Sequence, residues 1–233
     1  MKRKGFAVRA VMLMMAVFVA ALFGGCGGYR SIFVASVTGD VSVSREGQAD
    51  EIACYEGMKL QNQDVVTTLE GGSVILKLDD DKYVYLEANT QIQINAAGKT
   101  GSTQTKIELI RGVVSAVIEK KLAQNESFSV TVDNVSMVVR GTIFRIVRGQ
   151  TESGEPIVTV QTVEGTVGVA AGDDGEHALG AGLQNEIVLT DPDETFSSGD
   201  MPIDFSLRPL ATRDWLKPAL LPPPSPIRPP DQS

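Results

Sequence analysis

Five segments of the chain share one pattern, in which a glycine separates two runs of β-branched and other apolar residues. A glycine inside a strand usually marks a bulge, a bend or a close approach between backbones. The pattern therefore predicts strands that bend at the glycine and pass from one sheet to another. The segments are residues 34–43, 66–78, 107–118, 135–147 and 158–169, with central glycines Gly39, Gly72, Gly112, Gly141 and Gly165.

The remaining periodicity also indicates strands. Phe128, Val130 and Val132 alternate with polar residues, which is the pattern of a half-buried strand. No window of 12 residues carries a helical stripe, and 113–124, the nearest, begins with β-branched residues. The central glycines are too unevenly spaced for a strict solenoid repeat. We therefore expect an all-β fold, a compact two-layer sandwich or roll of bent strands that is solenoid-like in part.

Turn-forming residues separate these strands. The acidic run 79–81 predicts a hairpin tip, and the stretch 95–105, rich in Gly, Thr and Ser, predicts a longer loop. Residues 149–156 and 172–175 predict two further loops.

The N-terminus has the layout of a secretion signal. Four basic residues precede or open an apolar run of 14 residues, Ala10 to Phe23, and Gly24, Gly25 and Cys26 follow. Small residues directly before a cysteine resemble a bacterial lipobox, in which the cysteine is acylated and becomes the mature N-terminus. The alternative is an uncleaved anchor, but the run is shorter than the roughly 20 residues that cross a bilayer. We expect a signal peptide at 1–25 and a lipid on Cys26, which would hold the protein at the extracytoplasmic side of a membrane.

Composition divides the rest of the chain and excludes one class of partner. We expect a lipid-anchored linker at 26–30, a β domain at 31–198, an irregular strap at 199–221 and a proline-rich tail at 222–233.

Removing residues 1–25, which hold four basic and no acidic residues, leaves 17 basic and 29 acidic residues, a net charge of −12. Nucleic-acid binding, which needs basic patches, is not expected.

Candidate catalytic and metal-ligating residues are few. His177 is the single histidine and has no partner at ligand spacing, so neither zinc binding nor His-dependent catalysis is expected. We expect Cys54 to be a small buried or half-buried side chain and not a reactive thiol. Residues 98–100 end like a phosphate loop but lack its first glycine. The acidic run 79–81 lacks the spacing of an EF-hand, which leaves calcium binding as a minor alternative. We expect no enzyme activity and no cofactor.

Six short motifs in order resemble a FecR-type domain over residues 36–170. The segment 139–144, Val-Arg-Gly-Thr-Ile-Phe, is the most diagnostic, and Gln63 stands where the family commonly has Gly. The other motifs are residues 39–41, 56–68, 72–78, 108–112 and 163–167.

The physical chemistry of the residues favours structural roles for the diagnostic segment, with ligand binding as the alternative. Gly141 would permit a turn that a side chain forbids, and Thr142 would hydrogen-bond the local backbone. Phe144 would enter the core, Arg140 would brace the bend, and Gly165 would belong to the closing motif.

The resemblance also implies a function. Proteins named for this domain relay an iron-siderophore signal to a sigma factor, through a cytoplasmic region and a receptor-contacting domain. Nine residues precede the apolar run here, and the β domain is followed by a proline-rich tail, so we do not carry that relay over. We expect a non-enzymatic, lipid-anchored binding or regulatory module of the cell envelope, with a protein or glycan partner. The alternative is a structural envelope or wall-associated scaffold.

Replacing Cys26 tests the anchor directly. Cys26→Ala should abolish fatty-acid labelling and leave an uncleaved precursor or a released product, because the acylated thiol is lost. Radiolabelled palmitate incorporation, followed by gel electrophoresis, measures both effects. Labelled protein of normal size from this variant would show that the anchor lies elsewhere.

Overall fold

The computed structural model describes residues 30–79, 81–139, 141–171, 175–189 and 201–202. In this part of the chain there is no helix, as expected, and therefore no helix long and apolar enough to cross a membrane. The expected signal peptide, Cys26, most of the strap at 199–221 and the tail lie outside the described residues.

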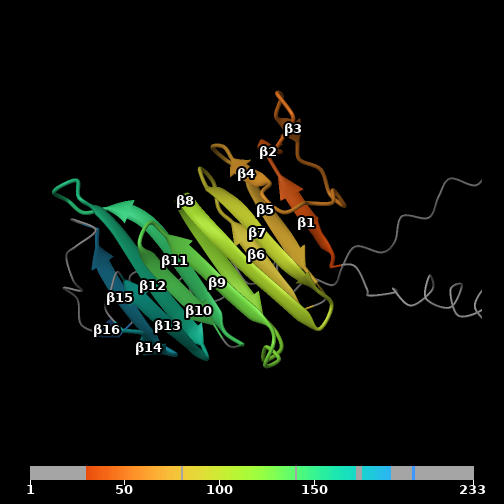
Figure 1. The fold of residues 1–233 in the computed structure, drawn as a ribbon. Helices are drawn as coiled ribbons and strands as arrows, with labels where there is room; N and C mark the ends of the chain where they lie inside the picture. Colours follow the sequence, from red (N-terminus) through yellow and green to blue (C-terminus); the bar gives the residue numbers. More distant parts are fainter. Residues whose placement is uncertain (1–29, 80, 140, 172–174, 190–200, 203–233) are drawn as a thin grey trace, which may run out of the picture.

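Sixteen strands make up the described part of the chain (Figure 1). Their bounds are β1 Ile32–Thr38, β2 Val41–Ser44, β3 Ile52–Ala53, β4 Val65–Thr68, β5 Ser73–Leu78, β6 Lys82–Leu86, β7 Gln91–Lys99, β8 Ser102–Ile118, β9 Ser127–Val132, β10 Val135–Val139, β11 Ile143–Gln150, β12 Pro156–Glu164, β13 Thr166–Ala171, β14 His177–Gly180, β15 Leu183–Val188 and β16 Met201–Pro202.

The strands form one open, mixed sheet that folds into two layers. Layer A runs β1-β5-β6-β8-β11-β12-β15-β16, and layer B runs β3-β2-β4-β7-β8-β9-β10-β13-β14. Strand β8 belongs to both, because its first half pairs with β7 and β9 and its second half with β6 and β11. The β8–β9 pair is parallel, and all other pairs of named strands are antiparallel. The all-β prediction is confirmed.

One hydrophobic core lies between the layers. Alternate residues of the strands point inward and are buried, including Phe128 and Val130 of layer B and Phe144 and Ile146 of layer A. These four side chains are fully buried. Burying each large apolar side chain contributes about 1.5–3 kcal/mol relative to its exposed state.

The chain changes layer at the predicted glycines. Gly39 lies between β1 and β2, Gly112 lies within β8, Gly141 lies between β10 and β11, and Gly165 lies between β12 and β13. All four have φ between 65° and 89°. At the remaining predicted corner, between β4 and β5, the positive φ belongs to Gly71 and not to Gly72. Gly72 instead fits closely against the Asp40 carbonyl oxygen.

Two further corners, at Asn89 and Gly182, lack the predicted glycine pattern, as does the change of layer between the second half of β8 and β9, over residues 119–126. Asn89 turns the chain between β6 and β7 with φ 57°, and Gly182 turns it between β14 and β15 with φ 78°. Asparagine enters the left-handed region more readily than most residues, which explains the first of these corners.

The predicted loop at 95–105 is wrong. Strand β7 continues to Lys99 and β8 begins at Ser102, so the turn contains only Thr100 and Gly101. The stretch carries few apolar residues, but Thr103 and Thr105 supply β-branched, inward-facing positions and are buried. The hairpin tip at 79–81 is confirmed between β5 and β6. The 149–156 loop is shorter than predicted, because its first two residues end β11 and Pro156 begins β12. His177 begins β14 and does not lie in a loop.

Gly165 and Gly101 offer a matched test of the corners. Both have φ near 80°, but a Cβ on Gly165 would lie 2.7 Å from the Gly141 carbonyl oxygen, whereas one on Gly101 would meet nothing within 4 Å. Gly101→Ala should lower the free energy of unfolding by about 1–2 kcal/mol through the positive φ alone. Gly165→Ala should add an overpacking cost of about 1–3 kcal/mol. Urea titrations that give equal losses for the two variants would contradict tight corner packing.

Candidate functional site

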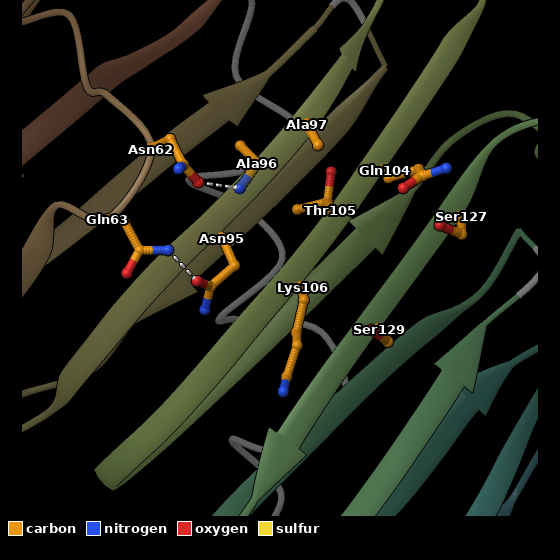
Figure 2. A pocket seen from close by; sticks show the side chains of 10 residues that line it. All are labelled: Asn62, Gln63, Asn95, Ala96, Ala97, Gln104, Thr105, Lys106, Ser127 and Ser129. Carbon is orange, nitrogen blue, oxygen red and sulfur yellow. Dashed lines mark hydrogen bonds between the residues drawn. The ribbon is translucent and has the colours of Figure 1, made fainter.

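A polar groove lies on the outer surface of layer B, beside the β7–β8 hairpin. Its volume is about 320 Å³. Figure 2 shows side chains from the loop before β4, from β7, from β8 and from β9 around it. The lining residues are Asn62, Gln63, Asn95, Ala96, Ala97, Gln104, Thr105, Lys106, Ser127 and Ser129.

An ion pair holds the loop that supplies one wall. The carboxylate of Asp64 is fully buried and accepts hydrogen bonds from Arg45 Nε at 2.8 Å and Nη2 at 2.7 Å. It also accepts the backbone N–H of Gln61 at 2.8 Å. The hydrogen bond to Asp64 raises the pKa of Arg45, against the opposing effect of desolvation. Bidentate guanidinium–carboxylate contacts fix geometry, so the neighbouring Asn62 and Gln63 are held in place.

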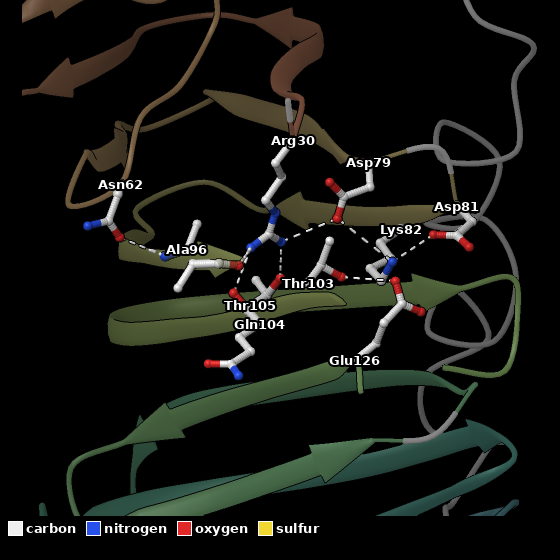
Figure 3. A network of polar contacts seen from close by, with 11 residues as sticks. Arg30, Asn62, Asp79, Asp81, Lys82, Ala96, Thr103, Gln104, Thr105 and Glu126 are labelled. Carbon is white, nitrogen blue, oxygen red and sulfur yellow. Dashed lines mark hydrogen bonds and ion pairs between the residues drawn. The ribbon is translucent and has the colours of Figure 1, made fainter. Parts of the chain in front are cut away.

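Arg30 joins the start of β1 to the far wall of the groove (Figure 3). Its guanidinium donates to the carbonyl oxygens of Ala97 at 3.0 Å and Gln104 at 2.6 Å, and to Thr105 Oγ1. It also contacts the Asp79 carboxylate at 3.3 Å, and only 8% of the side chain is exposed. Three residues that line the groove therefore depend on one arginine at the N-terminal end of the domain.

Lys82 neutralises the acidic hairpin tip. Its ammonium lies 2.8 Å from Asp81 and 3.8 Å from Asp79, and 2% of the side chain is exposed. Figure 3 shows these pairs beside Arg30. In the described part of the chain, no three His, Cys, Asp or Glu side chains lie close enough to hold a metal ion together. The described carboxylates of the acidic tip thus face cationic side chains.

The described residues of the diagnostic segment form a corner, and none of them lines the groove. Gly141 has φ 77°, Phe144 is fully buried, and the Thr142 side chain packs beside Gly165. The Thr142 hydroxyl finds no hydrogen-bond partner among the described residues, in contrast to the expected bond to the backbone. Arg140, like Cys26, lies outside the described residues.

Cys54 is half-buried and packs against the core, as predicted. Desolvation raises the pKa of its thiol to about 11, although a backbone hydrogen bond acts in the opposite direction. The thiolate is therefore a minor species at neutral pH, which does not favour a nucleophilic role.

Sequence reasoning missed the groove residues. The outward positions of β7 carry Gln91, Gln93 and Asn95, and those of β8 carry Gln104 and Lys106. This alternation of polar and inward residues was the available signal. The assignment of 95–105 to a loop concealed this alternation, because only a regular strand places alternate side chains on opposite faces of a sheet.

The buried Asp64 should be far more sensitive to substitution than a half-exposed aspartate. Asp64→Asn keeps the size but leaves Arg45 without its charge partner, which should lower the free energy of unfolding by about 3 kcal/mol. Asp133, 48% exposed, pairs with Arg148 at 2.9 Å and has φ 50°, which asparagine also adopts. Asp133→Asn should cost about 1 kcal/mol or less. Thermal unfolding of the two variants measures the difference, and equal losses would contradict the role given to Asp64.

Residues 64–168 match the family described as FecR protein. No curated protein matches the chain. Two similar solved structures are crystal structures of a candidate anti-sigma factor from Parabacteroides distasonis, at 1.65 and 2.50 Å resolution. Their sequence identities are 16% and 17%, and their TM-scores are 0.48 and 0.47. Each alignment covers 59% of this chain and 59% of the other, so the chain spans under two thirds of these relatives. The matched family segment runs from β4 into β13 and contains the layer-changing corners of β8, β10–β11 and β12–β13, so the similarity to the FecR family covers the central strands of both layers.

Proposed function

We propose that this protein is a non-enzymatic binding and regulatory module of the cell envelope. The observation that carries the proposal is the similarity of residues 64–168 to the FecR family. This segment forms the centre of both layers, so the strands that line the groove are part of a rigid scaffold. Rigid strands that present polar side chains suit recognition of a ligand or of another protein.

We further propose that a lipid on Cys26 tethers this module to a membrane. Arg30 is fixed to the groove wall and follows Cys26 by four residues, so their Cα atoms lie within about 14 Å even in an extended chain. The groove end of the domain would then stay near the membrane surface. A partner embedded in the membrane or lying against it could reach the groove.

Site-specific photocrosslinking in membranes tests this function. A photoreactive phenylalanine at Gln104, an exposed groove residue, should form a covalent adduct with a partner. The control places the photoreactive phenylalanine at Glu155 instead, which is exposed in the β11–β12 turn, and this variant should not form that adduct. Adding Cys26→Ala should reduce the Gln104 adduct severalfold, because the tether holds the groove near the membrane.

Mass spectrometry of the adduct identifies the partner. Equal crosslinking from Gln104 and Glu155, or no adduct from either position, would contradict binding of a protein partner through the groove. An adduct at Gln104 that is unaffected by Cys26→Ala would contradict the role of the tether.

A further inference from the structure

The groove carries a charge unlike that of the chain as a whole. The full sequence has a net charge of −8, yet the ten lining residues include no carboxylate and one cation, Lys106. Lys106 is exposed at the middle of the groove, opposite Asn95 on β7 and Ser129 on β9. Figure 2 shows these side chains around the same space. The Lys106 ammonium would attract a ligand with one negative group, and none of these ten residues carries a carboxylate that would repel it.

The amide groups of the groove are oriented by the protein. Asn62 Oδ1 accepts the backbone N–H of Ala96 at 2.7 Å, which leaves the Nδ2 of Asn62 as a donor. Gln63 Nε2 donates to Asn95 Oδ1, which leaves Gln63 Oε1 as an acceptor and Asn95 Nδ2 as a donor. The hydroxyls of Ser127 and Ser129 can both donate and accept. The groove thus offers fixed donors, fixed acceptors and hydroxyl groups around a single ammonium.

Gln63 occupies a backbone conformation that does not favour glutamine. Its φ is 70°, in the left-handed region that costs an ordinary L-residue about 1–2 kcal/mol. The other described non-glycine residues with positive φ are Asp79, Asn89 and Asp133, whose short polar side chains adopt it more readily. Glycine would remove the strain at position 63 but would also remove the amide from the groove. Strain of this kind concentrates at ligand sites, where the side chain is needed.

We propose that the groove binds a saccharide that bears a carboxylate. The carboxylate pairs with the Lys106 ammonium, while the sugar hydroxyls exchange hydrogen bonds with Asn62, Gln63 and Asn95. None of the described lining residues is aromatic and could stack on a sugar ring, so a monosaccharide should bind with a Kd of about 0.1–1 mM. This inference rests on the proposed binding function and names the chemical class of ligand for the same groove.

Calorimetric titration of the purified full chain in detergent tests the proposal. The acidic probes are glucuronic acid and N-acetylmuramic acid, and their neutral counterparts are glucose and N-acetylglucosamine. At least one acidic sugar should bind about tenfold more tightly than its neutral counterpart. Lys106→Gln should remove that preference, whereas Lys99→Gln, at an exposed β7 position outside the groove, should preserve it.

Gln63→Gly separates binding from folding. It should weaken binding of the acidic sugar at least threefold while the Tm stays level or rises, because the backbone strain is relieved. A loss of binding accompanied by a large fall in Tm would contradict the assignment of Gln63 to the ligand.

Other outcomes would overturn the proposal. These are equal binding of acidic and neutral sugars, no saccharide binding, an unchanged preference in Lys106→Gln, or inorganic phosphate that competes as well as the sugar acids. Crosslinking from Gln104 to a protein, in the absence of saccharide binding, would leave the proposed function standing and refute this inference. Acidic-sugar binding without any crosslinked partner would support this inference and count against a protein partner.

Discussion

The fold depends on close backbone contact at the corners where the chain passes between layers. A Cβ at Gly112 would lie 2.6 Å from the Cα of Thr90, and one at Gly165 would lie 2.7 Å from the Gly141 carbonyl oxygen. The Gly112 corner is therefore packed against the Asn89 corner, and the Gly165 corner against the Gly141 corner. This contact lets β8 bend without interruption and pair with two strands in each layer. Without such bends, the inward rows of Val, Ile and Leu could not face one another across a single core.

Bending at the corners also separates the two surfaces of layer B. Inward positions of β8, such as Ile107 and Leu109, are buried in the core, while outward Gln104 and Lys106 remain exposed. Because side chains alternate along a strand, the outer surface can change without disturbing the core. The motifs that resemble the FecR family coincide with corners, core strands and the Asp64 ion pair. The groove uses Asn62 and Gln63 from one of these motifs, and its β7, β8 and β9 residues lie between the motifs. A domain of this kind can keep its fold while the residues of its outer surface vary.

Four of the corners could be predicted from sequence, whereas the groove leaves only the polar alternation of β7 and β8 as a sequence signal. Glycine between apolar runs has few physical explanations, so Gly39, Gly112, Gly141 and Gly165 were correctly expected to change layer. The Asn89 corner was not predicted, because a left-handed asparagine leaves no distinctive pattern in the sequence. The groove was difficult to predict for a different reason. Its walls come from segments far apart in sequence, and strand pairing alone brings Asn95, Lys106 and Ser129 together. The parallel β8–β9 pairing, which places Ser127 beside Gln104, has no local signal at all.

Arg30 joins the N-terminal end of the described chain to the groove. Its side chain is 8% exposed, and its guanidinium binds two carbonyl oxygens of the β7–β8 hairpin as well as Asp79. A buried guanidinium is costly to desolvate, so its hydrogen-bond acceptors must all be kept in place. Moving the start of β1 would therefore disturb Ala97, Gln104 and Thr105 together, and all three line the groove. With a lipid on Cys26, a pull on the tether would reach Arg30 before it reached any other described residue. Ligand binding and the position of the domain at the membrane would then be coupled through a single side chain.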